Sequence, residues 1–154
     1  MYSENRITIN APLPLIFAAS ANIENWPRIL AHYRYVRPRR WPDGRSVFAM
    51  SAWRNFWPVN WTSTQEVIAP HQRGGPLVRY KHVKGVTRGM DVEWSFIPTD
   101  AGILVRISHD FHPGWPLLGG WPAQLVVGHL FVENIADKTL RGIKRYVERG
   151  VVKA

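Results

Sequence analysis

The feature that most constrains this chain is a long amphipathic stretch at its C-terminal end. Apolar residues recur there mostly at steps of three, four or seven, a spacing that keeps them on one face of an α-helix. They are Leu125, Val132, Ile135, Ala136, Leu140, Ile143 and Val147. Proline suits a first helical turn and glycine suits the residue just past a helix end. We therefore predict one terminal helix over Pro122–Arg149, capped by Gly150, whose apolar side needs a partner surface.

Two glycines, Gly128 and Gly142, interrupt the predicted helix. Each costs about 1 kcal/mol relative to alanine in a helix interior. We therefore expect another segment to pack closely against the helix at these two positions.

Between residues 33 and 111 the hydrophobic pattern changes from a helical period to an alternation of two, which is typical of β-strands. Short turns rich in Gly, Pro and Asp separate the alternating segments. Successive strands joined by short loops imply an antiparallel meander, because a parallel sheet would need crossover helices. A short first strand over Arg6–Asn10 precedes them. The later predicted strands are Tyr33–Arg40, Ser46–Phe56, Val59–Ile68, Leu77–Val83, Met90–Ile97 and Ile103–Phe111.

Two short helical segments are predicted after the first strand, Leu15–Ala21 and Asn25–Leu30, with Asn25 as a candidate N-cap. Both are too short to be stable without packing on something. A curved sheet closed by one long helix would bury the apolar face of the helix and one face of every strand. The predicted fold is therefore α+β, a curved antiparallel sheet of about seven strands wrapped around a long C-terminal helix. We expect a single domain over residues 1–154.

Composition narrows the classes of function. The chain has no cysteine and no apolar run long enough to span a membrane, so we expect no disulfide and no stable membrane insertion. Its net charge of +9 is scattered, apart from a small cluster at Arg37, Arg39 and Arg40, which is more typical of a solvated surface than of nucleic-acid binding. The first residues lack the pattern of a signal peptide. We expect a cytoplasmic monomer or homodimer that binds no nucleic acid.

Alternation assigns strand residues to the two faces of the sheet. In the last two strands the apolar face includes Trp94, His109 and Phe111, while charged residues lie on the other face. Two rows compete in segment 77–83, and we choose the row that contains Tyr80 and His82. The polar and aromatic members of the predicted inward set are Trp61, Ser63, Gln65, Tyr80, His82, Trp94 and His109.

Polar groups on a core face need hydrogen-bond partners, and burying one unpaired costs about 1 to 3 kcal/mol. Several of them on one face indicate a hydrated or ligand-filled cavity between sheet and helix. Taken singly, His109 is better explained as a neutral core histidine bonded to a backbone carbonyl, and Trp61 and Trp94 as core filling. Taken together, the residues support the cavity and the filled core about equally.

Other kinds of site have little support. The six histidines form no pair at the helical i, i+4 spacing, and His109 and His112 fall on opposite faces of a strand. The chain has no Gly-x-Ser-x-Gly elbow and no phosphate-binding loop. We therefore expect no metal centre and no cofactor.

Several segments of the sequence resemble the START-related (SRPBCC) superfamily of helix-grip proteins. They are residues 25–33 (NWPRILAHY), 61–63 (WTS), 89–94 (GMDVEW), 108–111 (SHDF) and the terminal helix. Within the superfamily, the resemblance is to the polyketide cyclase/dehydrase group, which includes bacterial aromatase/cyclases and coenzyme Q-binding proteins. The resemblance covers nearly the whole chain, and it implies a deep cavity that takes an apolar or polyaromatic ligand.

In aromatase/cyclases of this group, Trp, Ser, Arg and sometimes His side chains fold a poly-β-keto chain and assist an aldol condensation and a dehydration. The positions that look matched are Trp26, Trp61, Ser63, Trp94 and His109. The departure is Gln65, where the resemblance implies an inward Arg. An enolate would then need another partner, such as Arg54 or a water molecule.

The resemblance leaves two functions open. As a cofactor-free aromatase/cyclase, supplied by an acyl carrier protein, the protein would use His109 as general acid or base. As a non-catalytic carrier of a lipid, quinone or isoprenoid, it would use His109 only to hydrogen-bond the ligand. The predicted ligand-binding residues are Trp26, Arg54, Trp61, Ser63, Gln65, Tyr80, His82, Trp94 and Phe111. A third interpretation makes the apolar loop Trp115–Trp121 a protein-interaction or membrane-touching surface.

Overall fold

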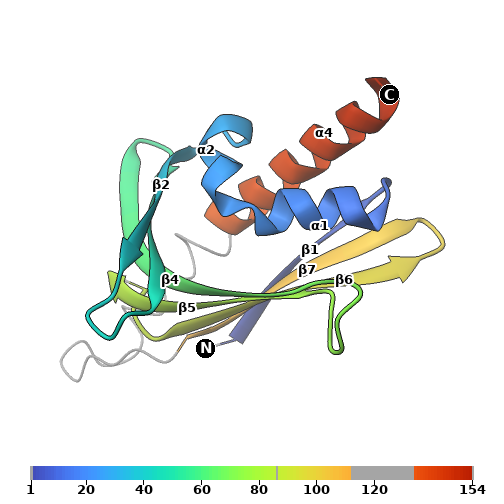
Figure 1. The fold of residues 1–154 in the computed structure, drawn as a ribbon. Coiled ribbons are helices and arrows are strands. Elements are labelled where there is room, and N and C mark those ends of the chain that lie inside the picture. Colours follow the sequence, from blue (N-terminus) through green and yellow to red (C-terminus); the bar gives the residue numbers. More distant parts are fainter. Residues whose placement is uncertain (1, 86, 112–133, 154) are drawn as a thin grey trace.

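The computed structural model describes residues 2–85, 87–111 and 134–153, the last three by their backbone alone. Seven antiparallel strands form one bent sheet, and the helices lie together on one side of it (Figure 1). The strands are β1 (Tyr2–Ile9), β2 (Tyr33–Arg40), β3 (Ser46–Arg54), β4 (Trp57–Ile68), β5 (Leu77–Gly85), β6 (Met90–Thr99) and β7 (Gly102–Phe111). The helices are α1 (Leu13–Ala21), the 3-10 turn η1 (Ile23–Asn25), α2 (Trp26–Ile29) and the terminal α4 (Asp137–Lys153). The predicted fold class is confirmed.

The strand order is β1-β7-β6-β5-β4-β3-β2, so each strand from β2 to β7 pairs with its neighbour in sequence. The first strand instead pairs with the last, with Tyr2 opposite Asp110 and Ile9 opposite Ile103. This register places the inward residues of β4 to β7 side by side. His109 lies opposite Val92, for example.

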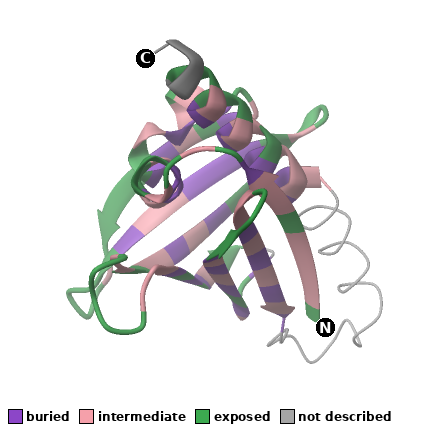
Figure 2. Cartoon of the chain, turned by 90° about the vertical axis from the view of Figure 1, so that its right-hand side faces the viewer, coloured by how far each residue is buried: buried purple, intermediate pink, exposed green. Residues whose placement is uncertain are grey.

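The alternation predicted for the inner face is confirmed. Trp61, Tyr80, Trp94 and His109 are each at most 6% exposed, and buried and exposed bands alternate along the strands in Figure 2. An exception is Val67, which by alternation belongs to the inward row of Trp61 and Gln65 but is 44% exposed near the end of β4. The inner face thus forms the wall against which the helices pack.

The chain turns between β3 and β4 at Asn55 and Phe56, earlier than the predicted joint at residues 57 and 58. Arg54 pairs with Trp57 across this two-residue turn, and Asn55 has a φ of 53°, a left-handed conformation that asparagine tolerates. Pro58 is tolerated within β4 because β5 pairs only with residues from Trp61 onward. The position therefore has no β5 partner that would need a backbone N–H from residue 58. The turn therefore projects Phe56 from the end of a hairpin.

Two predictions about helix ends were wrong. Helix α4 does not stop at Arg149 but continues through Gly150 to Lys153, because no proline follows and one glycine costs only about 1 kcal/mol. Asn25 precedes α2 without making a side-chain capping hydrogen bond. The predicted helix start at Pro122, Gly128 and the loop at 115–121 lie outside the described residues.

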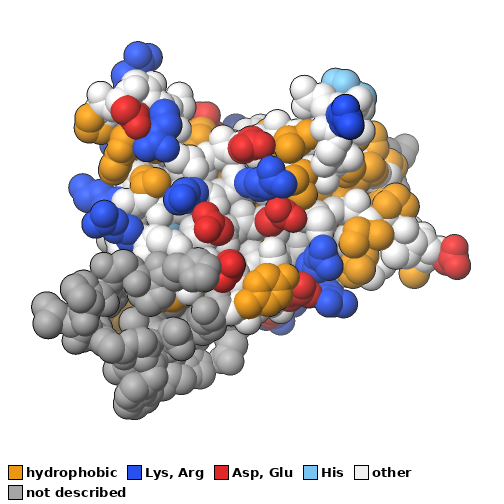
Figure 3. All heavy atoms as spheres, turned by 90° about the horizontal axis from the view of Figure 1, so that it is seen from below, with side chains coloured by type: hydrophobic (Ala, Val, Ile, Leu, Met, Phe, Trp, Pro, Cys, Tyr) orange, Lys and Arg blue, Asp and Glu red, His pale blue; other side chains and the backbone are white. Residues whose placement is uncertain are grey.

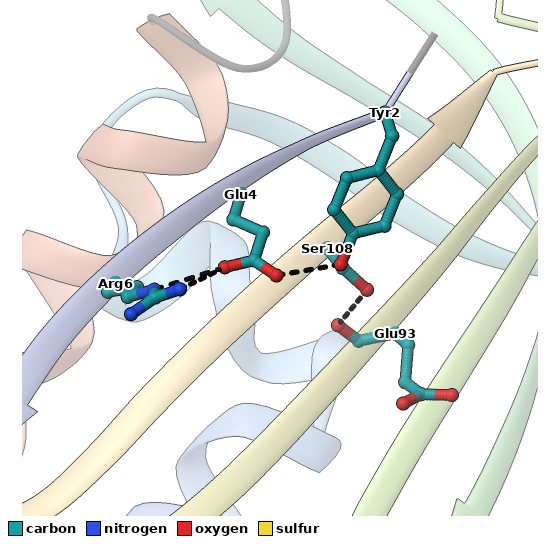
Figure 4. Close-up of polar contacts among 5 residues, drawn as sticks. All are labelled: Tyr2, Glu4, Arg6, Glu93 and Ser108. Atoms are coloured by element: carbon teal, nitrogen blue, oxygen red, sulfur yellow. Dashed lines mark hydrogen bonds and ion pairs between the residues drawn. The ribbon is translucent and has the colours of Figure 1, made fainter.

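The outer face of the sheet is polar, and acidic and basic side chains lie intermixed on it (Figure 3). The Glu4 carboxylate accepts hydrogen bonds from the Tyr2 hydroxyl at 2.7 Å and from the Arg6 guanidinium at 2.6 and 3.0 Å (Figure 4). These two donors hold the pKa of Glu4 below its usual value. Arg79 pairs with both Glu66 and Glu93. The charges of this face thus largely satisfy one another.

The close approach predicted at Gly142 is confirmed. A Cβ atom built there would lie 2.5 Å from Leu30 Cδ2, in the segment that follows α2. Leu30 is buried, so α4 rests directly on this side chain. Among the described helices, none is long and apolar enough to cross a membrane.

We expect Gly142→Val to lower the free energy of unfolding by about 1 to 3 kcal/mol, because the new methyl groups overlap the space of Leu30. Gly150→Val is the matched control, since a Cβ there meets nothing within 4 Å. Denaturant unfolding of both variants measures the difference. Equal stability of the two variants would contradict the close contact.

Candidate functional site

A cavity of about 50 Å³ lies between the inner face of the sheet and the start of α4. Five aromatic side chains line it together with two histidines: Trp26, Tyr33, Trp61, Tyr80, Trp94, His82 and His109. The volume suits one or two water molecules, whereas pockets for drug-sized ligands measure roughly 300 to 1,000 Å³. The aromatic-lined space predicted from the sequence therefore exists, but its size in this conformation is that of a hydration site.

The aromatic rings contact one another in a chain. Trp26 lies between Trp94, with centroids 5.7 Å apart, and Tyr33, at 5.0 Å. Tyr33 in turn contacts Trp61 at 6.1 Å, and Trp61 stacks on His82 at 5.9 Å. Trp26 Nε1 also donates a hydrogen bond to the carbonyl oxygen of Ala19 at 3.0 Å, which fixes the indole between helix and sheet.

Both cavity histidines are buried and neutral at pH 7. Burial, with the nearby His109, lowers the pKa of His82 to about 3, and burial lowers the pKa of His109 to about 4. His82 Nδ1 lies 2.6 Å from Thr87 Oγ1. His109 Nδ1 is buried and has no hydrogen-bond partner among the described residues. His109 thus has a ring nitrogen whose hydrogen-bonding capacity no described residue uses.

Gln65 positions the hydroxyl of Tyr80. Its Nε2 donates one hydrogen bond to the carbonyl oxygen of Ala21 at 2.8 Å and another to Tyr80 Oη at 3.1 Å. Burial raises the pKa of Tyr80, so the phenol stays protonated. Because Tyr80 Oη accepts from Gln65, its own hydrogen is left to donate elsewhere. This pair of hydrogen bonds was not predicted from the sequence, because it depends on where the last residue of α1 lies in the folded protein.

A buried polar link joins α4 to the segment after α2. Thr139 Oγ1 donates to the carbonyl oxygen of Ile135 at 2.7 Å and lies 3.0 Å from His32 Nε2. Burial and the charge of Lys138 lower the pKa of His32 to about 4. Residues 134–136 form a π-helical turn ahead of α4, and such wide turns are common at functional sites. One indication in the sequence that Thr139 is part of the site is that it is a polar residue on the apolar face of the predicted helix.

Four predicted site residues do not line the cavity; one is Gln65, which reaches it only through its hydrogen bond to Tyr80. Ser63 is fully buried, and its hydroxyl donates to the backbone oxygens of Thr64 at 2.8 Å and Lys81 at 3.2 Å. Phe111 is buried in the core, and Arg54 lies beside the turn at the end of β3. Their roles in ligand binding stay predictions. Within the described segments, no three metal-ligating side chains come together.

A larger hollow, of about 1850 Å³, lies between α1, α2, α4 and the β3–β4 turn, and we call it the outer groove. Its described lining includes six cations and no acidic residue: Arg28, Lys138, Arg141, Lys144, Arg145 and Arg149. Leu15, Ile29 and Val147 contribute apolar surface. His32 lines the groove while Thr139 lines the inner cavity. Their contact is therefore part of the wall between the two spaces.

The family described as polyketide cyclase/dehydrase and lipid transport has a sequence model that matches residues 9–138 of this chain. A predicted polyketide cyclase of Streptomyces halstedii is 29% identical over 106 residues, which cover 68% of this chain and 95% of that protein.

Solved structures share the fold. The Zhui aromatase/cyclase from Streptomyces sp. R1128 superposes with a TM-score of 0.78 at 18% identity, over 98% of this chain and 95% of that one. A START superfamily protein from Mycobacterium smegmatis superposes with a TM-score of 0.71 at 14% identity, over 96% and 97% of the two chains. At these identities the likeness establishes the fold alone.

The depressed histidine pKa values predict how stability depends on pH. Between pH 6.5 and about 4 the unfolded chain binds protons at His32, His82 and His109 that the folded chain excludes. The free energy of unfolding should therefore fall on acidification, by roughly 1.4 kcal/mol per pH unit for each of these histidines. The free energy of unfolding should return to its full value above pH 6.5. Denaturant unfolding at a series of pH values measures this slope.

His109→Gln should reduce the pH dependence of the free energy of unfolding by the contribution of one histidine. The matched control is His71→Gln, because His71 is exposed on the loop between β4 and β5. If both variants kept the slope of the parent protein, His109 would not be the buried neutral group described above.

Proposed function

Because the chain belongs to the polyketide cyclase/dehydrase and lipid transport family, we propose that it binds an apolar, carbonyl-bearing small molecule between the sheet and α4 and cyclises it as a polyketide aromatase/cyclase. The observation that carries the proposal is His109, a neutral buried histidine that lines the aromatic cavity and whose Nδ1 has no hydrogen-bond partner among the described residues. An acyl carrier protein would deliver the substrate in this proposal.

The cavity must enlarge to admit such a ligand, because 50 Å³ holds only one or two waters. We propose that it opens where α4 begins. The contact between His32 and Thr139 is part of the wall toward the outer groove, and the π-helical turn at 134–136 directly precedes α4 on the cavity side. Breaking that contact would join the cavity to a hollow of ample volume. The aromatic rings would then stack on the planar parts of the ligand.

His109 is suited to act as a general base. In the proposed step, Nδ1 removes a proton from a methylene carbon that lies between two carbonyl groups of the substrate, leaving an enolate. The enolate carbon attacks a second carbonyl carbon and forms the new ring bond. The resulting alkoxide takes back the proton held by His109, and loss of water then completes the dehydration. A base must be neutral at the start of the step, and burial keeps His109 neutral at pH 7.

Tyr80 is the candidate donor to the enolate oxygen. Its hydrogen is free because Gln65 Nε2 donates to its oxygen at 3.1 Å, and burial keeps the phenol neutral. A donor fixed in advance within a dry site stabilises developing negative charge more than it would in water. In this proposal Gln65 and Tyr80 together do the work of the arginine that the resemblance implies at position 65.

The second candidate function is a carrier that shields a lipid, quinone or isoprenoid without changing it. The apolar character of the lining favours it, since five aromatic side chains and the aliphatic groups of Met50, Val92 and Ile107 outnumber the polar groups. His109 Nδ1 would then only hydrogen-bond a ligand oxygen. The two candidates differ in whether any bond of the ligand changes.

His109→Asn should lower turnover of a synthetic poly-β-keto thioester by about 100-fold or more, while an aromatic product analogue still binds. Absorbance of the aromatic product measures turnover, and native mass spectrometry measures binding. His71→Asn is the matched control and should keep full activity. Unchanged turnover in His109→Asn would refute the role as base. A retained passenger with no turnover in the parent protein would favour the carrier.

Tyr80→Phe removes only the hydroxyl and should lower kcat by about 100-fold, with little change in analogue binding. Gln65→Ala should cause a smaller loss, because it leaves the hydroxyl in place but unoriented. The same absorbance assay, with kcat and KM separated, tests both variants. A Tyr80→Phe enzyme with unchanged kcat would remove this residue from the mechanism.

A further inference from the structure

Three exposed aromatic side chains cluster at the β3–β4 turn, and we call Trp53, Phe56 and Trp57 the aromatic tip. They are 38%, 91% and 71% exposed. Single exposed apolar residues are normal, but three within five positions form a patch. Tight two-residue turns usually carry Gly, Asn, Asp or Ser rather than an aromatic residue. Neither strand pairing nor turn geometry accounts for Phe56 at this position.

The aromatic tip lies at the edge of the cationic outer groove. Trp53 and Phe56 line the groove together with Arg28. The guanidinium of Arg34 lies 4.9 Å above the Trp53 ring. Apolar side chains and positive charge thus share one end of the molecule.

Much of the charge in the outer groove is unneutralised. Arg141 pairs with Asp137 and Lys144 pairs with Glu148. The other four cations of the lining make no ion pair with any residue that the structure describes. They are Arg28, Lys138, Arg145 and Arg149. The outer face of the sheet differs, because its charges lie in mixed-sign pairs (Figure 3). The side of the helices therefore carries positive charge that no described acidic residue neutralises.

We propose that the aromatic tip and the adjoining cations dock the protein on an anionic lipid surface. Aromatic rings favour the boundary between headgroups and acyl chains, and Lys and Arg near a membrane gain energy from anionic headgroups. The guanidinium of Arg34 can remain over the Trp53 ring and still donate N–H hydrogen bonds to a headgroup phosphate. Docking places the mouth of the outer groove against the lipid. It does not depend on the ligand or reaction proposed above.

The shape of the patch favours a membrane over a protein partner. A stable protein interface buries about 800 Å² on each side and usually has a broad, complementary surface. The aromatic tip consists of three side chains at the end of one two-residue hairpin turn, so it is a small projection and not a broad, flat surface. A soft lipid interface accommodates a projecting tip without a matching pocket.

The absence of cysteine allows one reporter to be placed at the tip. Phe56→Cys would be labelled with the environment-sensitive dye NBD and mixed with vesicles of equal parts phosphatidylcholine and phosphatidylglycerol. We expect a blue shift and a brighter emission. The control is Ile97→Cys with the same label, since Ile97 is 39% exposed near the β6–β7 turn, at the opposite side of the sheet (Figure 1). Its emission should stay unchanged.

Sedimentation with the same vesicles tests the side chains directly. The double variant Phe56→Ser, Trp57→Ser keeps every charge and should bind at least about tenfold more weakly than the parent protein, whereas Ile97→Ser should bind equally well. Arg145→Gln should weaken binding about fivefold, and Arg73→Gln, an equal change of charge on the β4–β5 loop, should have little effect. Thermal unfolding verifies that each variant is folded.

Three outcomes would overturn the proposal. The first is equal binding of the parent and the double variant, which would make the attraction one of net charge alone. The second is an unchanged emission of the dye at position 56 when vesicles are added. The third is a parent protein that does not bind vesicles but dimerises, together with a double variant that stays monomeric. The aromatic tip would then bind a second copy of the chain.

Discussion

The burial of one helix face is the constraint on which the described architecture depends. Helix α4 and the turn before it present Ile135, Leu140, Ile143 and Val147, all at most 4% exposed, and only a bent sheet offers a surface wide enough to cover them. The same packing turns the apolar rows of β4 to β7 toward the start of α4. At Gly142 the contact with Leu30 brings the segment after α2 against the helix. Sheet, short helices and terminal helix are thus held around one interior.

The interior combines tight aromatic contacts with polar groups that are not all satisfied. Leaving a buried nitrogen such as His109 Nδ1 without a partner costs about 1 to 3 kcal/mol, which a fully apolar core would avoid. Gln65, Tyr80, Thr139 and His32 are by contrast hydrogen-bonded around the edge of the cavity. The polar groups at the rim are fixed by hydrogen bonds, whereas His109 Nδ1 has no partner within the described part of the chain, which is the arrangement expected of a site that binds or reacts.

Period-two alternation was enough to predict the inner face, because a strand has only two sides. It identified Trp61, Tyr80, Trp94 and His109 from sequence alone. The contact between Gln65 and Tyr80 and the one between His32 and Thr139 could not be predicted in this way, since each joins separate elements whose placement is set by packing. Cavity size was equally inaccessible, because it depends on rotamers. The predicted end of α4 at Gly150 was wrong. The prediction gave too much weight to the low helix propensity of one glycine, and the helix continues through it.

The pairing of β1 with β7 has a consequence for the order of folding. Tyr2 meets Asp110, so the first strand made during synthesis has no partner in the sheet until the last strand exists. Strands β2 to β7 join neighbours in sequence and can close one hairpin at a time. The N-terminal strand and the terminal helix must both wait for that meander. The interior is therefore closed last, by β1 and α4, and the aromatic wall of a nascent protein stays uncovered until β7 and α4 have been made.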